Sequence, residues 1–426
     1  MKVISSLAAH GYLEKAFELY LEMKLKRIAP TLATFQKLAT AARKSYSRNG
    51  IPAAVKILEK IVMTLNAKEF QVIMSGPIFG TLIRAYGLLN EYDKAAQIFK
   101  SLDSTNGQCL SAMLYVCSTS SPARWQDALV IIHCSDIIIG RKGPSHIEAN
   151  ALSYAMIACA KENEWEESLN ILELYGSPMH RDAVHVSNDA FNSVIAAAGR
   201  TGRPDIAVKL LNDMTSKYLV QPDERSFRSA IIACNQAEHE KRRQRIKGSK
   251  ILPSNEDANL NKDFHWRLSP KEDALSFQYW EAALSLLRRM QEEGLTPDIQ
   301  TYSSAISACQ ASGQWQRAIG ILRKMTRKPE NNVVPNLFCF NAAIAACEKG
   351  DAWLEALELF ERMKEDSGVK PNFITVNSIL IALDRAKQSE LAESLYIESL
   401  RDKIVNPWKW RRDDDLTNIR AMVRTT

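Results

Sequence analysis

A sequence unit of about 36 residues recurs along this chain and limits the folds that it can adopt. The clearest copies end in Pro-Asp or Pro-Asn, as in residues 295–298 (LTPD) and 369–372 (VKPN). The prolines at such endings lie 75, 38, 36 and 36 residues apart, at Pro222, Pro297, Pro335, Pro371 and Pro407. The first interval is one repeat plus about 40 residues. A fixed period of roughly 20 to 50 residues is typical of stacked repeats, each of which contacts only its neighbours.

Cysteines and tryptophans recur in the same phase as the prolines. Five cysteines end short apolar runs: Cys117, Cys159, Cys234, Cys309 and Cys347. Five tryptophans precede an Ala or Ser by three residues: Trp125, Trp165, Trp280, Trp315 and Trp353. A cysteine on an apolar helix face is small, soft packing, so we expect these thiols in the core. We expect the tryptophans to pack between helices.

Each unit is predicted to form two helices. In residues 337–372, apolar spacing predicts a first helix from about Phe340 to Cys347 and a second from about Trp353 to Lys364. Gly350 and Asp351 break the pattern between them. Neither helix can bury its apolar stripe alone. Stacking the units side by side solves this, so the sequence predicts an all-α solenoid, an α-α superhelix of helical hairpins.

Composition and charge exclude several other classes of protein. The 426 residues are 46% hydrophobic and 24% charged, with only 17 glycines and 15 prolines, which excludes a collagen-like or wholly disordered chain. The net charge of +6 permits a polyanionic partner without requiring one. No run of 18 apolar residues exists, so we expect no membrane partner. Eight cysteines without a CxxC pair weaken disulfide, zinc and redox interpretations.

The repeat resembles the pentatricopeptide repeat (PPR) family. The resemblance implies a right-handed solenoid and is strongest over residues 188–408. The Pro-Asp ending distinguishes it from tetratricopeptide repeats, which are also helical. The best copies are residues 190–195 (AFNSVI) leading to 221–223 (QPD), 339–344 (CFNAAI) leading to 370–372 (KPN), and the second helix 354–363 (LEALELFERM).

The period divides the chain into a PPR array, residues 1–408, and a C-terminal tail, residues 409–426. The array begins with a partial repeat at 1–31. The repeats that follow are 32–75, 76–106, 107–148, 149–187, 188–223, 224–298, 299–336, 337–372 and 373–408.

The resemblance implies that the chain binds single-stranded RNA and reads about one base per repeat. In the family the fifth and last residues of a repeat select the base, and apolar neighbours sandwich it. Carried over by position, the candidate pairs are Asn192 with Asp223 (uracil), Ser303 with Asn336 (adenine), and Asn341 with Asn372 (a pyrimidine). Arg228 with Asp298 departs from the family pattern and receives no base. Asn377 is the fifth residue of the last repeat.

The repeats before residue 188 have degenerate endings, and no base is assigned to them. Their fifth and last residues are Gln36 with Ser75, Gly80 with Asn106, Ser111 with Glu148, and Ser153 with Ser187.

An insertion, residues 238–278, interrupts repeat 224–298 between its helices. It begins with a basic run that includes Lys241, Arg242, Arg243 and Arg245. The composition favours a mobile, solvated surface loop. The alternative is a basic arm whose side chains contact RNA phosphates.

Sequence motifs give no indication of catalysis. The P-C-x-x-C motif, which zinc deaminases require in addition to H-x-E, and the HExxH motif are missing from the sequence, and residues 413–415 (DDD) are typical of a solvated helix start. We therefore predict a chain without enzymatic activity, catalytic residue, metal or cofactor.

Three functional classes remain open. The first is a sequence-selective RNA-binding factor in organelle RNA processing, stability, editing or translation. The second is a helical scaffold for protein partners. The third is the RNA-recognition part of a nuclease whose catalytic domain lies outside this chain. RNA-processing proteins are further candidate partners, and the sequence leaves the oligomeric state open. The resemblance implies a mitochondrial or plastid location, although the chain carries no targeting segment of its own.

Overall fold

The computed structural model describes residues 2–65, 77–102, 107–139, 149–175, 186–248, 278–327, 333–365, 368–402 and 404. Within these ranges the secondary structure is helical, with no strand. The helices are α1 (Lys2–Ala9), α2 (Leu13–Leu25), α3 (Leu32–Asn49), α4 (Ile51–Met63), α6 (Pro77–Leu88), α7 (Tyr92–Ser101), α8 (Gly107–Thr119), α9 (Trp125–Ile139), α10 (Ala149–Lys161), α11 (Trp165–Tyr175), α12 (Asn188–Arg200), α13 (Pro204–Ser216), α14 (Glu224–Gly248), α16 (Tyr279–Glu292), α17 (Ile299–Ala311), α18 (Trp315–Arg327), α19 (Leu337–Lys349), α20 (Trp353–Glu365), α21 (Phe373–Arg385) and α22 (Ser389–Arg401).

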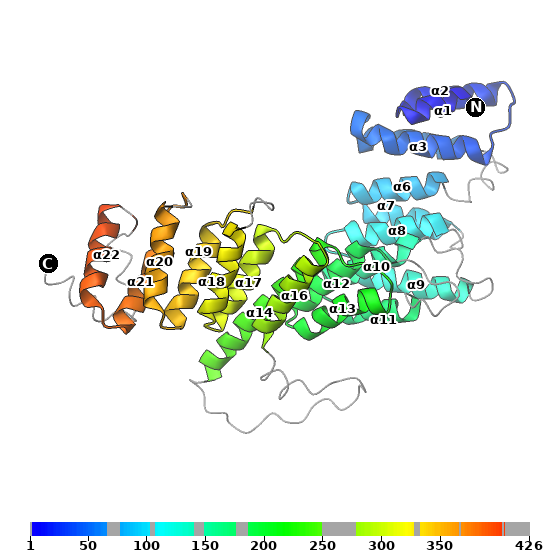
Figure 1. The fold of residues 1–426 in the computed structure, drawn as a ribbon. Helices are drawn as coiled ribbons and strands as arrows, with labels where there is room; N and C mark the ends of the chain where they lie inside the picture. The colour runs from blue at the N-terminus through cyan, green and yellow to red at the C-terminus, as the bar shows by residue number, and fades with distance from the viewer. Residues whose placement is uncertain are drawn as a thin grey trace. The chain divides into compact units, whose positions relative to one another are not determined.

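The chain divides into two compact units. The first comprises residues 1–197 and 212–221, and the second comprises residues 198–211 and 222–426. In the first unit the first helices of the hairpins, α1, α3, α6, α8 and α10, pack in sequence order (Figure 1). In the second unit α14, α17, α19 and α21 do the same, and each contacts its own second helix. Each unit is therefore a solenoid of stacked helical hairpins, which confirms the predicted all-α fold. None of the described helices is long and apolar enough to cross a membrane.

The two helices of a hairpin are joined by a turn with one left-handed residue. These residues include Gly11, Asn90, Asn163, Gly202, Gly313, Asp351 and Lys387. The amide after the left-handed residue donates to a carbonyl five residues upstream, as from Gln314 to Cys309 at 2.9 Å. This Schellman geometry satisfies the last carbonyl groups of the first helix and turns the chain back on itself.

Gly350 lies at one of these turns but has an ordinary φ of −93°. The left-handed position belongs to Asp351, with φ 54°. A Cβ on Gly350 would overlap the Trp315 indole ring, which packs against the glycine from the preceding hairpin. Gly350 is therefore required by close packing and not by backbone conformation.

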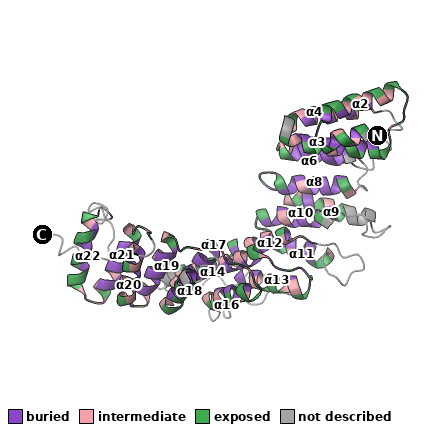
Figure 2. Ribbon diagram, turned by 45° about the horizontal axis from the view of Figure 1, so that its top comes forward, coloured by how far each residue is buried: buried purple, intermediate pink, exposed green. Residues whose placement is uncertain are grey.

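A small side chain at the fourth position of the second helices lets neighbouring helices approach closely. The position is fully or almost fully buried at Ala16, Ala54, Ala95, Ala128, Ser168, Ala207, Ala318, Ala356 and Ala392, and in α16 the buried Ala283 is the fifth residue. Figure 2 shows the buried residues on the inner faces of the hairpins. Of the five tryptophans, Trp165 is buried, whereas the other four are only half-buried.

The five repeated cysteines are core residues, as expected. Each is completely buried. Burial raises the pKa of each thiol to about 12 at Cys117, Cys159, Cys234, Cys309 and Cys347. A thiol with so high a pKa carries almost no thiolate at neutral pH, so these side chains act as packing and not as nucleophiles.

The prediction that the insertion begins at residue 238 as a surface loop is wrong for residues 238–248. Helix α14 continues through them to Gly248. The segment is rich in Glu, Lys, Arg and Gln, which are strong helix formers, and it contains no glycine or proline before residue 248. The rest of the insertion, residues 249–277, and the tail, residues 409–426, lie outside the described residues.

Candidate nucleic-acid interface

The predicted fifth residues all lie near the start of first helices. Asn192 is on α12, Arg228 on α14, Ser303 on α17, Asn341 on α19 and Asn377 on α21. Asn192 and Ser303 are buried, with 6% and 9% exposure, whereas the other three are partly exposed. Because α14, α17, α19 and α21 are packing neighbours, the second unit brings four of these side chains to equivalent places on successive helices.

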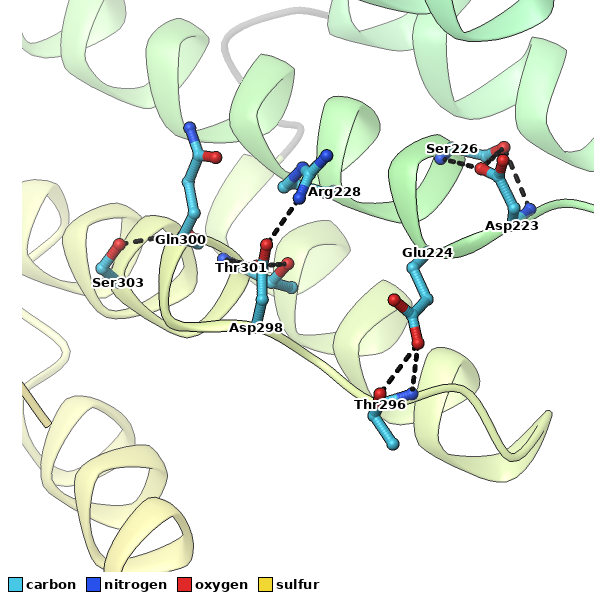
Figure 3. A network of polar contacts seen from close by, with 9 residues as sticks. All are labelled: Asp223, Glu224, Ser226, Arg228, Thr296, Asp298, Gln300, Thr301 and Ser303. Atoms are coloured by element: carbon cyan, nitrogen blue, oxygen red, sulfur yellow. Dashed lines mark hydrogen bonds and ion pairs between the residues drawn. The ribbon is translucent and has the colours of Figure 1, made fainter. Parts of the chain in front are cut away.

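The predicted last residues begin the next first helix as N-caps. A side-chain oxygen of Asp223 accepts from the Ser226 amide at 2.8 Å, and one of Asp298 accepts from the Thr301 amide at 2.8 Å (Figure 3). Asn336 and Asn372 do the same toward the third residue of their helices, each at 3.1 Å. Asp and Asn are among the best N-cap residues. Sequence analysis missed this role, although a Ser or Thr follows three of the four by three residues, a recognisable capping signature.

Asn341 and Asn372, predicted as a pair, are in direct contact. The Asn341 Nδ2 donates to Asn372 Oδ1 at 3.2 Å. The Thr375 hydroxyl donates to Asn341 Oδ1 at 2.6 Å. These bonds hold the Asn341 amide in one orientation between the end of one repeat and the start of the next.

Arg228 and Asp298 form an ion pair instead of a hydrogen-bonded amide pair. Their side chains meet at 2.5 Å and are 28% and 44% exposed (Figure 3). Partial burial acts to raise the pKa of Asp298, but hydrogen bonds from Thr301 and Arg228 outweigh it and hold the pKa below its ordinary value. Each side chain of this pair is therefore occupied by the other, which agrees with its departure from the family pattern.

Ser303 uses its hydroxyl within its own helix. Its Oγ donates to the Gln300 carbonyl at 3.0 Å (Figure 3). Such a bond is typical of serine in a helix and is readily exchanged for another acceptor.

A cavity of about 1040 Å³ runs along the first helices of the second unit. Asn341 lies in its wall, together with Phe338 and Ile374, which are 56% and 58% exposed. Large apolar side chains so exposed on a folded surface indicate a binding site when they surround polar groups. Polar and charged lining comes from Asn235, Gln236, His239, Glu240, Arg243, Ser307 and Gln310. We refer to this cavity as the groove.

The extended part of α14 contributes positive charge to the groove. The His239 Nε2 lies 2.9 Å from Ser307 Oγ. Burial lowers the pKa of His239, and the charges of Lys349, Arg242 and Arg243 lower it further. Burial and the Arg242 charge also lower the pKa of Lys349 to about 8. Burial first and the neighbouring cations second thus depress both pKa values, and a bound anion would offset the charge of those cations.

The residues that were predicted to contact the RNA backbone lie on helix α14 and not on a loop. The Lys241 ammonium lies 5.7 Å from the centre of the Tyr279 ring. Arg243 pairs with Glu240 at 3.6 Å and lines the groove. The side chain of Arg245 lies outside the described part of the structure.

Among the upstream pairs, only Ser153 with Ser187 has both members described. The Ser187 amide donates to Ser153 Oγ at 3.0 Å, so the fifth and last residues of this repeat are also in contact. Ser75, Asn106 and Glu148 lie outside the described residues. Across the described ranges, no group of three or more His, Cys, Asp and Glu side chains is placed to hold a metal ion.

Two family profiles match the chain. One described as "Pentatricopeptide repeat domain" matches residues 285–350. One described as "PPR repeat" matches residues 2–28, 78–104, 189–219 and 338–367. No curated protein sequence matches the chain.

Solved structures of similar proteins have low sequence identity. One is the PPR domain of Arabidopsis thaliana protein-only RNase P 1 in complex with tRNA, with 13% identity and a TM-score of 0.39, covering 56% of this chain and 100% of that chain. Another is the pentatricopeptide repeat protein PPR10 from maize, with 13% identity and a TM-score of 0.34, covering 93% of this chain and 57% of that chain. A third is PPR10 in complex with an 18-nt psaJ RNA element, with 13% identity and a TM-score of 0.31, covering 95% of this chain and 68% of that chain.

Proposed function

Because the chain is a pentatricopeptide repeat protein, we propose that it binds single-stranded RNA along its first helices and selects bases in the second unit. Single-stranded RNA is the nucleic acid whose base edges a row of helices can read, since its bases are unpaired and can be splayed apart. The observation that carries the proposal is the Asn341 amide, which lies in the wall of the groove and is held there by Asn372.

The surroundings of Asn341 have the chemistry that a nucleobase requires. Phe338 and Ile374 lie one repeat apart at equivalent positions and line the groove with Asn341. Their exposed apolar surfaces can cover the two faces of a flat base, and the amide then meets its edge. Stacking against side chains of this kind stabilises unpaired bases regardless of their sequence.

The hydrogen-bonding capacity of Asn341 supports selection of the base. A primary amide has two N–H donors and an oxygen with two lone pairs. Asn372 Oδ1 accepts from one of these N–H groups, and the Thr375 hydroxyl donates to one lone pair of Asn341 Oδ1. One donor and one lone pair of the amide then remain for the Watson–Crick edge of a base. The family pairing of Asn341 with Asn372 adds the base class, so the repeat is proposed to read a pyrimidine.

The RNA backbone is proposed to follow the positive edge of the groove. His239, Arg243 and Lys349 lie near the groove from two different helices. Phosphate contacts of this kind position a strand without reading its sequence. Within the second unit, repeat 224–298 is proposed to accept any base, repeat 299–336 adenine, and repeat 337–372 a pyrimidine. The repeats are proposed to meet the RNA in this order from 5′ to 3′.

A single substitution should change the base read by repeat 337–372. The Asn341→Ser variant recreates the Ser-with-Asn combination of Ser303 and Asn336, so its preference should move from a pyrimidine to adenine at one position. A well-formed hydrogen-bonded contact to a base contributes about 1–3 kcal/mol of discrimination. Selection from a random single-stranded RNA pool, followed by sequencing, measures the change.

The matched control is Asn170→Ser, which alters an exposed amide on the second helix α11. Its selected motif should equal that of the unsubstituted chain. A pool from which the unsubstituted chain enriches no RNA contradicts the proposed function itself. If the Asn341→Ser variant enriches the same RNA motif as the unsubstituted chain, only the assignment of Asn341 as the base-selecting residue is contradicted.

RNA affinity should rise as the pH falls through the range in which histidine titrates. The groups that face His239 are Ser307 from α17, Lys349 from α19, and Arg242, Arg243, Glu238 and Glu240 on its own helix. Burial and the charges of Lys349, Arg242 and Arg243 keep the pKa of His239 low in the free protein. A bound phosphate would offset them and raise it. The complex then binds more protons than the free chain, so lower pH favours binding. Dissociation constants from pH 8 to pH 5.5 at constant ionic strength test this.

The His239→Gln variant keeps a polar side chain but cannot titrate, and its affinity should vary less with pH. The control is His10→Gln, an exposed histidine in the first unit, whose pH dependence should equal that of the unsubstituted chain. Identical pH profiles for His239→Gln and the unsubstituted chain would show that no phosphate lies beside His239.

The cellular role is proposed from the family alone. It is the processing, stability, editing or translation of an RNA in a mitochondrion or plastid, with the chain as a binder and not as a catalyst. Co-purification of RNA from isolated organelles, with sequencing of the bound fragments, tests it. Recovery of a defined protein partner without RNA would favour the scaffold function instead.

A further inference from the structure

Three side chains on consecutive first helices of the first unit form a connected strip. They are Arg84 on α6, Tyr115 on α8 and Tyr154 on α10. The Arg84 guanidinium lies 5.8 Å from the centre of the Tyr115 ring. The Tyr115 and Tyr154 rings lie 5.3 Å apart at 76°. All three side chains are partly exposed. We call this set the aromatic strip.

The aromatic strip occupies the repeat positions that line the groove in the second unit. Arg84 and Tyr115 are ninth residues of their repeats, as are Ser307 and Ala345, which line the groove. Tyr154 is a sixth residue, as is Ala342, which also lines it. Arg84, Tyr115 and Tyr154 thus carry large side chains at positions where Ser307, Ala342 and Ala345 of the groove carry small ones.

The fifth residues beside the aromatic strip are poorly suited to read bases. Gly80 has no side chain. The Ser111 hydroxyl accepts from Arg84 Nη2 at 3.1 Å, and the Ser153 hydroxyl accepts from the Ser187 amide at 3.0 Å. None of the three carries an amide, in contrast to Asn341, and both serine hydroxyls are engaged by other parts of the chain, whereas that of Ser303 bonds to its own helix. These repeats therefore lack the amide that is proposed to contact the base in repeat 337–372.

The strip has a positively charged continuation on α3. The Tyr46 hydroxyl donates to the Thr81 carbonyl at 3.4 Å, which joins α3 to α6. Burial raises the pKa of Tyr46 to about 12, although the charges of Arg43 and Arg84 act to lower it. Arg43 is exposed. The surface thus combines aromatic rings with cations along a line, which is the composition of surfaces that bind single strands without sequence preference.

We propose that Arg84, Tyr115 and Tyr154 form a stacking platform for unpaired RNA bases that does not read their sequence. The inference rests on the proposed RNA-binding function and adds a second binding mode to it. A guanidinium and a phenol ring each offer a π surface that any base can stack on. The first unit then holds the strand, and the second unit selects the bases.

The test is the double variant Tyr115→Leu, Tyr154→Leu in the full chain. Leucine keeps an apolar side chain but has no ring on which a base can stack. Unstructured oligonucleotides of uridine and of adenosine, measured by fluorescence anisotropy, should bind roughly tenfold more weakly for each ring removed. The loss should be similar for both probes. The salt dependence should stay unchanged, because no phosphate contact is removed. The control is Tyr12→Leu, an exposed tyrosine at a hairpin turn of the same unit.

A second measurement uses the unsubstituted chain, in case the double variant does not fold. Single-stranded RNA carrying 4-thiouridine should photo-cross-link to the peptides that contain Tyr115 and Tyr154. Unchanged affinity of a folded double variant, or cross-links confined to the second unit, overturns the proposal. A loss seen with only one probe also overturns it, because the strip would then read sequence. Failure of the unsubstituted chain to bind either probe contradicts the proposed function instead.

Discussion

The Arg228→Asn variant is expected to gain a base preference that the unsubstituted chain lacks. The substitution replaces the ion pair with the same Asn-with-Asp combination as Asn192 and Asp223, which the family resemblance assigns to uracil. Uracil should then be favoured roughly tenfold or more at the nucleotide directly 5′ of the adenine, because a good hydrogen-bonded contact discriminates by about 1–3 kcal/mol. Competition among four RNAs that differ only at this nucleotide measures the gain.

Loss of the ion pair should leave the fold almost unchanged. Arg228 and Asp298 are 28% and 44% exposed, and a pair with that exposure contributes only about 0–1 kcal/mol. Asp298 continues to cap α17 through the Thr301 amide. The matched control is Arg228→Ala, which removes the ion pair without adding an amide and should bind all four RNAs equally. A uracil preference in the alanine variant would show that the amide is not the reading group.

The Gly350→Ala variant is expected to destabilise the second unit, although alanine favours helices more than glycine does. The added methyl group would overlap the Trp315 indole, so either the ring or the turn must move. Overpacking a tight contact costs about 1–3 kcal/mol. Thermal and urea denaturation, followed by circular dichroism, measure the loss.

The control for this variant is Gly320→Ala. Gly320 lies inside α18, and a Cβ there would meet no atom within 4 Å. That substitution should stabilise the chain by about 1 kcal/mol through helix propensity alone. Adding Trp315→Leu to Gly350→Ala should recover part of the lost stability. Equal shifts for the two glycine variants would contradict the packing explanation.

The hairpins and their phase could be predicted from sequence because one pattern repeats many times. The prolines, cysteines and tryptophans recur with a single period, so an error at one repeat is corrected by its neighbours. The second helix predicted from about Trp353 to Lys364 is observed as Trp353–Glu365. The first helix is longer than expected, since α19 begins at Leu337 and not near Phe340. Its start is set by the Asn336 cap, which a pattern of apolar residues does not reveal.

The departures from periodicity were harder to predict. Residues 238–248 have no apolar stripe, and their charge is equally typical of a solvated loop and of an exposed helix. In the structure the helix continues to Gly248, and His239 and Glu238 contact Ser307 and Ser312 of the neighbouring hairpin. The aromatic strip was missed for a different reason. Arg84, Tyr115 and Tyr154 are separated by whole repeats, so only stacking brings them together.

Which residues form the candidate base-reading pairs was predictable from the sequence, but the further hydrogen bonds of these residues were not. Sequence paired Asn341 with Asn372 and Arg228 with Asp298, and in the structure both pairs are in contact. Sequence gave no indication that Thr375 would hold the Asn341 amide or that Asp298 would be shared between Arg228 and Thr301. Those bonds depend on how one hairpin is docked on the next.

Under the proposed function, the last residue of a repeat both caps a helix and contributes to base recognition, which limits how such a chain can change its target during evolution. Asp223, Asp298, Asn336 and Asn372 each start a helix with a side-chain oxygen. Only Asp, Asn, Ser and Thr start helices well through a side chain. A mutation to any other residue would loosen the joint between two repeats as well as alter recognition. Under the same proposal, new specificities are more accessible through the fifth residue, which caps no helix.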